Sequence, residues 1–484
     1  MNVSLICDAT SGMVTSFAAP EVWQWLIQFF ILATALLLGN VLRRKVPFLK
    51  RSLVPTALIA GALILIFKAF PMCSSFVNKA AMEIVTYHAL GLGFVALALK
   101  NNKVETHSSA KTIIETGTLT ASTYMLQGIV GLLVSIPLFY FGGKLFYSAG
   151  LLLPMGYGQG PGQALNFGKI YANWAAEQGI PFAGTDFALS IAATGFLVGS
   201  VVGVIFLNVL RRRGVLKIKH NNDKTIRTLE EFEGSNEIPD TESVDKLTIQ
   251  LCMVLFVYFM VFLFTNWIQG LDLGDFGTKT LKPLLWGFNF LLGTLFGLFF
   301  KWSLNGFKKA KLVRREYVNN YLLTRISGFC FDVMIVAGTA AISFDAFGTF
   351  VIPFIIICTL GAIATFFYVL RISKHLYPDY PYEGFFSMFG MLTGTASNGM
   401  ILLREIDPKF DTPAANNLVL QTFPAIVLGF PVLLILGFAP KSFVNACITL
   451  VVLVVLLIAL TLFLMRTKIF KKRRIDKVEK QSVE

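Results

Sequence analysis

The stretch Met155-Gly-Tyr-Gly-Gln-Gly-Pro-Gly-Gln-Ala164 interrupts an apolar part of the chain with four glycines and a proline. Glycine adds backbone freedom and proline removes a hydrogen-bond donor, so this stretch cannot form a regular helix. A second interruption, Gly390-Met-Leu-Thr-Gly-Thr-Ala-Ser-Asn-Gly399, lies in the other half of the chain. Broken backbone at membrane depth is tolerated only where it packs in protein or lines a watery cavity. Two such segments at matching places predict the binding site of a secondary transporter.

The composition predicts an integral membrane protein. Of the 484 residues, 55% are hydrophobic and only 14% are charged, and the mean hydropathy is +0.67. Soluble domains carry roughly a quarter charged residues. The net charge of +14 would suggest nucleic acid in a soluble protein. Because lysine and arginine collect in the cytoplasmic loops of membrane proteins, we expect a lipid bilayer and no nucleic acid as partner.

About eleven segments are long and apolar enough to cross a hydrocarbon core about 30 Å thick. The spans expected in the first half of the chain are 22–42, 52–70, 81–99, 112–141 and 186–210. Those expected in the second half are 247–268, 284–300, 321–344, 349–370 and 416–438. One extra helix is expected at 446–465.

The two halves share one plan. The expected parts are an N-terminal segment outside the membrane (1–21), a first five-helix repeat (22–210) with a re-entrant hairpin at 145–171, a cytoplasmic linker (211–246), a second repeat (247–438) with a hairpin at 383–404, and, after the extra helix, a basic cytoplasmic tail (466–484). The fold class expected is therefore all-α, with two five-helix repeats and one added helix.

The distribution of basic residues predicts the orientation. Most of the 42 lysines and arginines fall on one side if the N-terminus is outside and each hairpin returns to the side it entered. Basic loops stay inside, so the C-terminus is expected to be cytoplasmic in a multi-pass protein of the cytoplasmic membrane. The two halves then have opposite orientations, and such inverted repeats are a recurrent plan of transporters.

The two interruptions carry neutral groups that suit an anion and a cation. The candidate binding residues are Gly158, Gln159, Gly160, Gly162 and Gln163 in the first, and Thr393, Gly394, Thr395, Ser397 and Asn398 in the second. Free N–H groups where a half-helix begins favour an anion. Released carbonyls and neutral side-chain oxygens suit Na⁺. The competing interpretation is that these glycines only let helices pack closely.

Ionisable residues inside membrane spans are costly and usually functional. Asp332 lies near the middle of an expected span and is a candidate binding residue, although Arg325, two turns earlier, offers an internal ion pair as the alternative. Lys169 and Arg404 follow the two interruptions and are candidates to bind a substrate carboxylate. Arg404 is equally compatible with an anchor on the basic side.

Enzyme motifs are missing from the sequence. It contains no phosphate-binding loop with lysine and serine or threonine, no His/Cys/carboxylate cluster with metal-ligand spacing, and no arguable Ser/His/Asp set. We therefore expect no enzymatic activity, no ATP-driven transport within this chain, and no cofactor other than Na⁺ as a coupling ion.

Three stretches resemble the bacterial sodium/glutamate symporter family, which is related in fold to 2-hydroxycarboxylate carriers. They are Ala89-Leu-Gly-Leu-Gly93, the run 156–169, and 188–210 with Gly195, Gly199 and Gly203. The likeness extends more weakly to 390–405 and over 22–438 as a whole. The first interruption departs from the family's Gly-Gly-His-Gly type of run. The resemblance implies a homodimer and a rigid-body movement of the hairpin-bearing domains against a scaffold.

These observations predict Na⁺-coupled symport of a small anionic amino acid, with glutamate first, by alternating access. The alternative within transport is a di- or tricarboxylate or a hydroxy acid. An alternative from another class is a non-transporting membrane sensor or scaffold. In that case the 211–246 linker or the basic tail would bind partners or anionic lipid.

Overall fold

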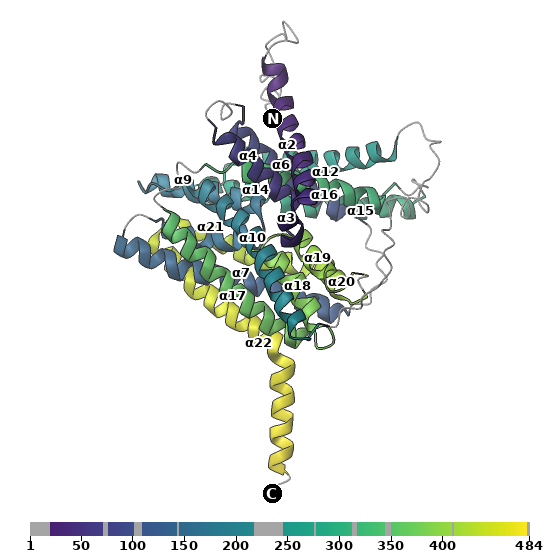
Figure 1. Ribbon diagram of the computed structural model, residues 1–484. Coiled ribbons are helices and arrows are strands. Elements are labelled where there is room, and N and C mark those ends of the chain that lie inside the picture. Colours follow the sequence, from purple (N-terminus) through teal and green to yellow (C-terminus); the bar gives the residue numbers. More distant parts are fainter. Residues whose placement is uncertain are drawn as a thin grey trace.

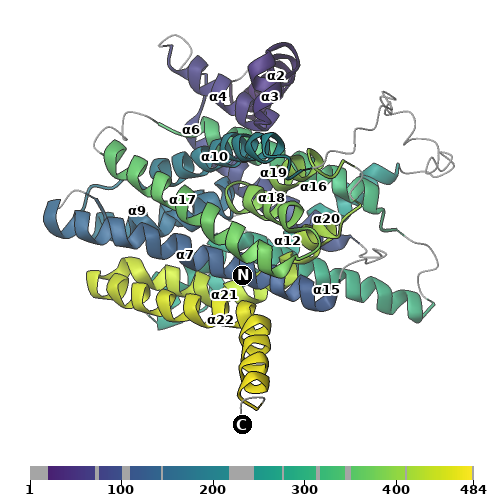
Figure 2. The ribbon, with the colours of Figure 1, turned by 60° about the horizontal axis from the view of Figure 1, so that its bottom comes forward.

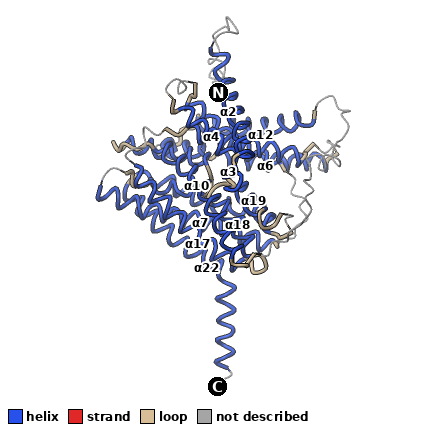
Figure 3. The backbone as a smooth tube through the Cα atoms, in the orientation of Figure 1, coloured by secondary structure: helices blue, strands red, loops and turns tan. Residues whose placement is uncertain are grey.

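The computed structural model describes the chain as a set of helices joined by loops (Figure 1). The described residues are 20–70, 76–100, 109–142, 145–216, 245–274, 277–311, 317–343, 350–408 and 411–481. Within these ranges, the side chains of 20–22, 50, 279–280 and 467–481 are not described. No strand occurs within these ranges (Figure 3). Among the described residues, 10 helices are long and apolar enough to cross a membrane. The prediction of an all-α integral membrane protein is confirmed.

The first half contains one span that is shorter than expected. Its elements are α2 (Pro20–Lys45), α3 (Pro47–Ser52), α4 (Thr56–Lys68), α6 (Lys79–Leu99), α7 (Ala110–Gly142), η2 (Ala149–Leu151), α8 (Leu152–Tyr157), α9 (Pro161–Glu177) and α10 (Gly184–Arg212). The span expected at 52–70 is the 13-residue apolar helix α4. At 1.5 Å per residue it is only about 20 Å long. This helix accounts for the difference between ten spans and the eleven expected.

The second half and the C-terminal helix follow the expected order. The elements are α12 (Lys246–Gln269), η3 (Gly277–Leu281), α14 (Lys282–Gly287), α15 (Asn289–Lys309), α16 (Asn320–Ala340), α17 (Val351–Leu376), α18 (Pro381–Leu392), α19 (Ala396–Arg404), α20 (Ala414–Leu420), α21 (Thr422–Phe438), η5 (Ala439–Lys441) and α22 (Phe443–Gln481). The extra helix continues into the basic tail as α22, which projects from the body (Figure 1). Most of the expected N-terminal segment and linker, at 1–19 and 217–244, lies outside the described residues.

The helices form two groups with α10 and the two broken segments between them. The α6 group consists of α2, α4, α6, α12, α15 and α16, and the α7 group consists of α7, α17, α21 and α22. Figure 2 shows α21 and α22 side by side next to α7. Corresponding helices make the same contacts in the two halves. The third span of one half packs on the second span of the other, as α6 does on α15 and α16 does on α4. Likewise, α7 packs on α8 in the first half and α17 packs on α18 in the second.

Each broken segment is a pair of short helices that fold back on one another. In the first, the Tyr147 hydroxyl donates to Gln178 Oε1 at 2.7 Å. The two ends of the segment that contains α8 and α9 therefore lie together. In the second, a Cβ added to Gly390 would lie 2.8 Å from the Cα of Gly399. Backbone approach this close brings α18 and α19 into direct contact.

The base of the first hairpin depends on a second close approach between backbones. A Cβ on Gly131 of α7 would overlap the carbonyl group of Gly150 in η2, and the reverse substitution would clash equally. Only glycine at both positions lets α7 and η2 pack at this distance.

We predict that Gly131→Ala destabilises the protein by about 1–3 kcal/mol, because the added methyl group overpacks this contact. The measurement is thermal unfolding of the purified protein in detergent. Gly142→Ala, at the end of the same helix where a Cβ meets nothing within 4 Å, is the control and should not lower the midpoint. Equal midpoints for the two variants would contradict the close contact.

Candidate functional site

The two broken segments meet, although they are far apart in the sequence. Gly160 has φ +78 and precedes α9, while Gly394 and Thr395 precede α19. A Cβ built on Gly160 would lie 3.5 Å from Thr395 Cγ2 and 3.7 Å from the Gly394 carbonyl oxygen. The two turns are therefore in contact. Backbone with φ +78 and ψ −172 is essentially restricted to glycine.

Helix α10 supports both turns. It packs against α8, α9, α18 and α19. A Cβ on Gly199 would lie 2.6 Å from Thr393 Oγ1, and one on Gly195 would lie 2.9 Å from Tyr157 Cδ1. The glycines of α10 therefore provide the space in which the ends of α8 and α18 approach each other.

Helix α7 supplies hydrogen bonds to the carbonyls at the breaks. The Tyr124 hydroxyl donates to the Gly158 carbonyl at 3.0 Å. Gln127 Nε2 donates to the Leu392 carbonyl at 2.9 Å and to Thr365 Oγ1 at 3.0 Å. Buried carbonyls without partners are costly, so these bonds stabilise the interrupted helices.

A cavity of about 180 Å³ lies between the turns and the α6 group. Its polar side is formed by the two turns, α7 and the junction of α20 with α21: Thr120, Tyr124, Gly158, Gln159, Gln163, Gly394, Thr395, Ser397, Gln421 and Thr422. Its apolar side comes from α6, α15 and α16: Leu90, Phe94, Leu97, Phe290, Leu291, Phe331 and Met334. Met391, Ala396, Ala425, Ile426, Gly429 and Leu433 complete the lining. None of these lining residues is charged.

Several polar groups at this cavity have no hydrogen-bond partner among the described residues. Gln163, with 1% of its surface exposed, and Asn398, with 2%, each lack a partner for both amide atoms. Thr395 Oγ1 is unpaired as well. Asn398 lies behind the lining, where a Cβ on Gly394 would be 2.5 Å from its Nδ2. Buried polar atoms are nearly always paired, so this cluster is suited to bind a ligand.

Two helices begin at the same place without a side-chain cap. Neither Gly160 at α9 nor Thr395 at α19 provides a capping hydrogen bond. The first-turn N–H groups and the positive ends of both helix dipoles therefore face the contact between the turns. An unpaired, buried Gln163 lies in the first turn of α9.

The structure brings half of the twelve predicted site residues to the lining of this cavity. Gly158, Gln159, Gln163, Gly394, Thr395 and Ser397 line it. Gly160, Gly162, Thr393 and Asn398 do not line it and lie in or next to the turns. Gly162 faces α6, because a Cβ there would be 2.8 Å from Leu90 Cδ1.

Asp332 and Arg404 are not part of the lining. The Asp332 side chain is exposed on α16, whereas its neighbour Phe331 lines the cavity. Arg404 is exposed at the opposite end of α19 from the cavity. Arg325 stacks over the ring of Tyr321 at 5.1 Å, and no ion pair with Asp332 is found between these described side chains.

Four polar lining residues were not predicted from the sequence: Thr120, Tyr124, Gln421 and Thr422. Thr120 Oγ1 donates to Gln421 Oε1 at 2.8 Å, which joins α7 to the start of α21. A signal was present, because α7 contains buried threonines and serine at 116–123 and Gln127 within a long apolar helix. Polar residues in a membrane span often face other helices or a cavity.

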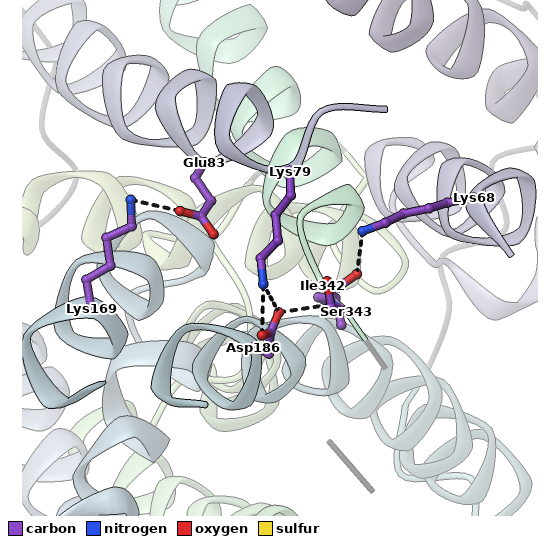
Figure 4. Close-up of polar contacts among 7 residues, drawn as sticks. All are labelled: Lys68, Lys79, Glu83, Lys169, Asp186, Ile342 and Ser343. Carbon is purple, nitrogen blue, oxygen red and sulfur yellow. Dashed lines mark hydrogen bonds and ion pairs between the residues drawn. The ribbon is translucent and has the colours of Figure 1, made fainter. Parts of the chain in front are cut away.

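Ion pairs connect the α6 group to the first hairpin and α10 (Figure 4). Lys79 Nζ lies 2.8 and 2.9 Å from the Asp186 carboxylate oxygens, and Asp186 Oδ1 also accepts from the Ser343 backbone N–H at 2.9 Å. Lys169 Nζ lies 2.8 Å from Glu83 Oε2. Lys169 is therefore paired with a carboxylate of the protein itself, away from the cavity lining.

Comparison with protein-family models and with curated proteins found no match. The described residues also contain no group of three or more His, Cys, Asp or Glu side chains placed to hold a metal ion. What the cavity binds must therefore be argued from its own neutral lining.

We predict that Asp186→Asn lowers the stability of the protein by about 1–3 kcal/mol. Asp186 is buried, and the substitution leaves Lys79 without its counter-charge. Lys169→Gln should cost less than about 1 kcal/mol, since that lysine is half exposed. Thermal unfolding of both variants in detergent measures the difference. A larger loss of stability for Lys169→Gln than for Asp186→Asn would contradict the conclusion that the Lys79–Asp186 pair is the more buried of the two.

Proposed function

We propose that this multi-pass membrane protein is a secondary active transporter that binds a small organic anion at the cavity between its two broken segments, together with Na⁺. The observation that carries the proposal is the contact of two uncapped helix starts, at Gly160 and Thr395, beside one cavity. Such paired breaks, contributed by the two halves of one chain, are characteristic of transporter binding sites.

The anion would be bound by backbone rather than by a basic side chain. N–H groups at the start of a helix and the helix dipole both favour negative charge. Gln163 adds an unpaired amide that can donate a hydrogen bond to the anion. Because no charged residue lines the cavity, the empty site holds no permanent buried charge whose desolvation would have to be offset.

The cation would be bound by neutral oxygens behind the same turns. Asn398 Oδ1, Thr395 Oγ1 and Gln163 Oε1 are unpaired oxygens close to the break. Hard cations such as Na⁺ prefer oxygen ligands of this kind. A cation and an anion bound at neighbouring sites attract each other strongly where water is scarce. This mutual stabilisation is the physical basis of coupling that we propose.

Alternating access would require the hairpins and α10 to move against the α6 group. The pairs Lys79–Asp186 and Lys169–Glu83 join these parts, so a movement that opens the structure there must break them. The resemblance noted in the sequence implies a homodimer and glutamate as the solute, and the distribution of basic residues predicts a cytoplasmic-membrane location with the N-terminus outside. The dimer and the location remain part of the proposal. Glutamate, with dicarboxylates, tricarboxylates and hydroxy acids as alternatives, is the solute that the sequence predicts, and the lining of the cavity decides how well each of these fits.

We predict that the purified protein in proteoliposomes accumulates a labelled organic acid when an inward sodium gradient is imposed. Accumulation should disappear when a sodium ionophore collapses the gradient, because the cation then supplies no driving force. Uptake that is indifferent to sodium would reject Na⁺ coupling. Failure to take up any member of a panel of amino acids, mono-, di- and tricarboxylates would reject the carrier function itself.

We predict that Gly160→Ala and Gly394→Ala both impair transport, for different reasons. Alanine at Gly160 has space but is strained at φ +78, at a cost of about 1–3 kcal/mol. Alanine at Gly394 displaces the side chain of Asn398, which would lie 2.5 Å away. Uptake should fall by about ten- to a hundredfold, with normal membrane insertion. Gly306→Ala, where a Cβ meets nothing within 4 Å, is the control and should transport normally.

A further inference from the structure

The cavity has two chemically different faces. Its polar face carries the turns, and its opposite face carries aromatic rings from three helices of the α6 group. Phe94 contacts Phe290 at a centroid distance of 5.1 Å and Phe331 at 5.5 Å, both edge to face. We call Phe94, Phe290 and Phe331 the aromatic wall. All three line the cavity, and edge-to-face contacts of this kind stabilise one another.

The position of the aromatic wall is determined by helix packing. A Cβ on Gly93 would lie 2.7 Å from Phe331 Cε1, so the Phe331 ring packs directly against the backbone of α6. A Cβ on Gly293 of α15 would lie 2.9 Å from Val95 Cγ2, which shows that α15 also approaches α6 closely. Both neighbours of α6 are therefore close enough to contribute rings to one continuous wall.

The wall restricts which anions the cavity can bind well. Glutamate carries two carboxylates and an ammonium group, and none of the described lining residues has a carboxylate to pair with the ammonium. If one carboxylate binds at the helix starts, the remaining charges must be accommodated near a neutral, largely apolar surface. Burial of an unpaired charge is strongly unfavourable. A solute with one carboxylate and an apolar body avoids this cost.

We infer that the cavity binds an organic monocarboxylate with an apolar body and no ammonium group, such as an arylacetate or a branched aliphatic acid. The carboxylate lies at the starts of α9 and α19, and the body lies on the aromatic wall. This assignment rests on the proposed function and names the substrate class of the same site. The volume of about 180 Å³ is sufficient, since an apolar cavity of about 150 Å³ admits benzene.

The test compares four probes by isothermal titration of the full-length protein in detergent, with sodium chloride present throughout. Phenylacetate has the required charge and body, phenylacetamide has the same body without the charge, acetate has the charge without the body, and glutamate has the additional charges. Phenylacetate should bind at least about tenfold more tightly than each of the other three.

Two pairs of variants locate the binding. Phe331→Ala should weaken phenylacetate binding at least about tenfold, whereas Phe329→Ala, on the same helix with 65% of its side chain exposed and outside the lining, should leave it unchanged. Thr395→Val removes an unpaired hydroxyl at the cavity and should weaken binding. Thr449→Val removes an equally unpaired, buried hydroxyl in α22 and should have no effect. Phe331→Leu replaces Phe331→Ala if thermal unfolding shows that the latter does not fold.

The outcomes separate this inference from the proposed function. Tighter binding or sodium-driven uptake of glutamate in preference to phenylacetate overturns the monocarboxylate assignment and leaves the carrier function intact. Equal binding of phenylacetate and phenylacetamide, or equal effects of the Phe331 and Phe329 substitutions, also overturns it. If no acid of the panel binds or is taken up, the proposed function fails together with the inference.

Discussion

Contact between two interrupted helices is the constraint on which the rest of this structure depends. Within a membrane, backbone groups that leave a helix find no water to replace their lost hydrogen bonds. Both turns, at 158–160 and 393–395, therefore either pack against protein or line the cavity. Tyr124 and Gln127 bond the carbonyls at the breaks. Glycines of α10 allow the two hairpins to approach, and only glycine permits the conformation at Gly160.

The charged residues of the protein are placed so that the cavity between the two turns stays neutral. The ion pairs Lys79–Asp186 and Lys169–Glu83 and the contact of Arg466 with Glu115 all lie outside the cavity lining. The lining of the cavity contains no charged residue. A site of backbone dipoles and neutral oxygens can favour an anion at the helix starts without carrying a net charge of its own. Its selectivity then depends on the bound ion pair and on the shape and polarity of the surrounding wall.

Several expectations from the sequence depended on neighbouring helices that a single segment does not specify. Asp332 was singled out by its position in a span, yet on α16 it is Phe331 and Met334 that line the cavity. A helix turns about 100° per residue, so the neighbours Phe331 and Asp332 point in different directions. Arg404 follows the second interruption in sequence but lies at the far end of α19. The polar residues at 116–123 of α7 could be recognised in the sequence. That Thr120 among them lines the cavity depends on the helices against which α7 packs.

The sequence by itself determined the membrane class, nearly all of the spans and the two breaks. These properties are local: hydropathy over about twenty residues and the backbone limits of glycine and proline act within one segment. Only the tertiary structure decided that Gly160 meets Thr395, that Lys169 pairs with Glu83, and that Phe94, Phe290 and Phe331 form the opposite wall. Each of these contacts joins residues from different helices. Their distances follow from how whole helices pack, and no single segment of sequence contains that information.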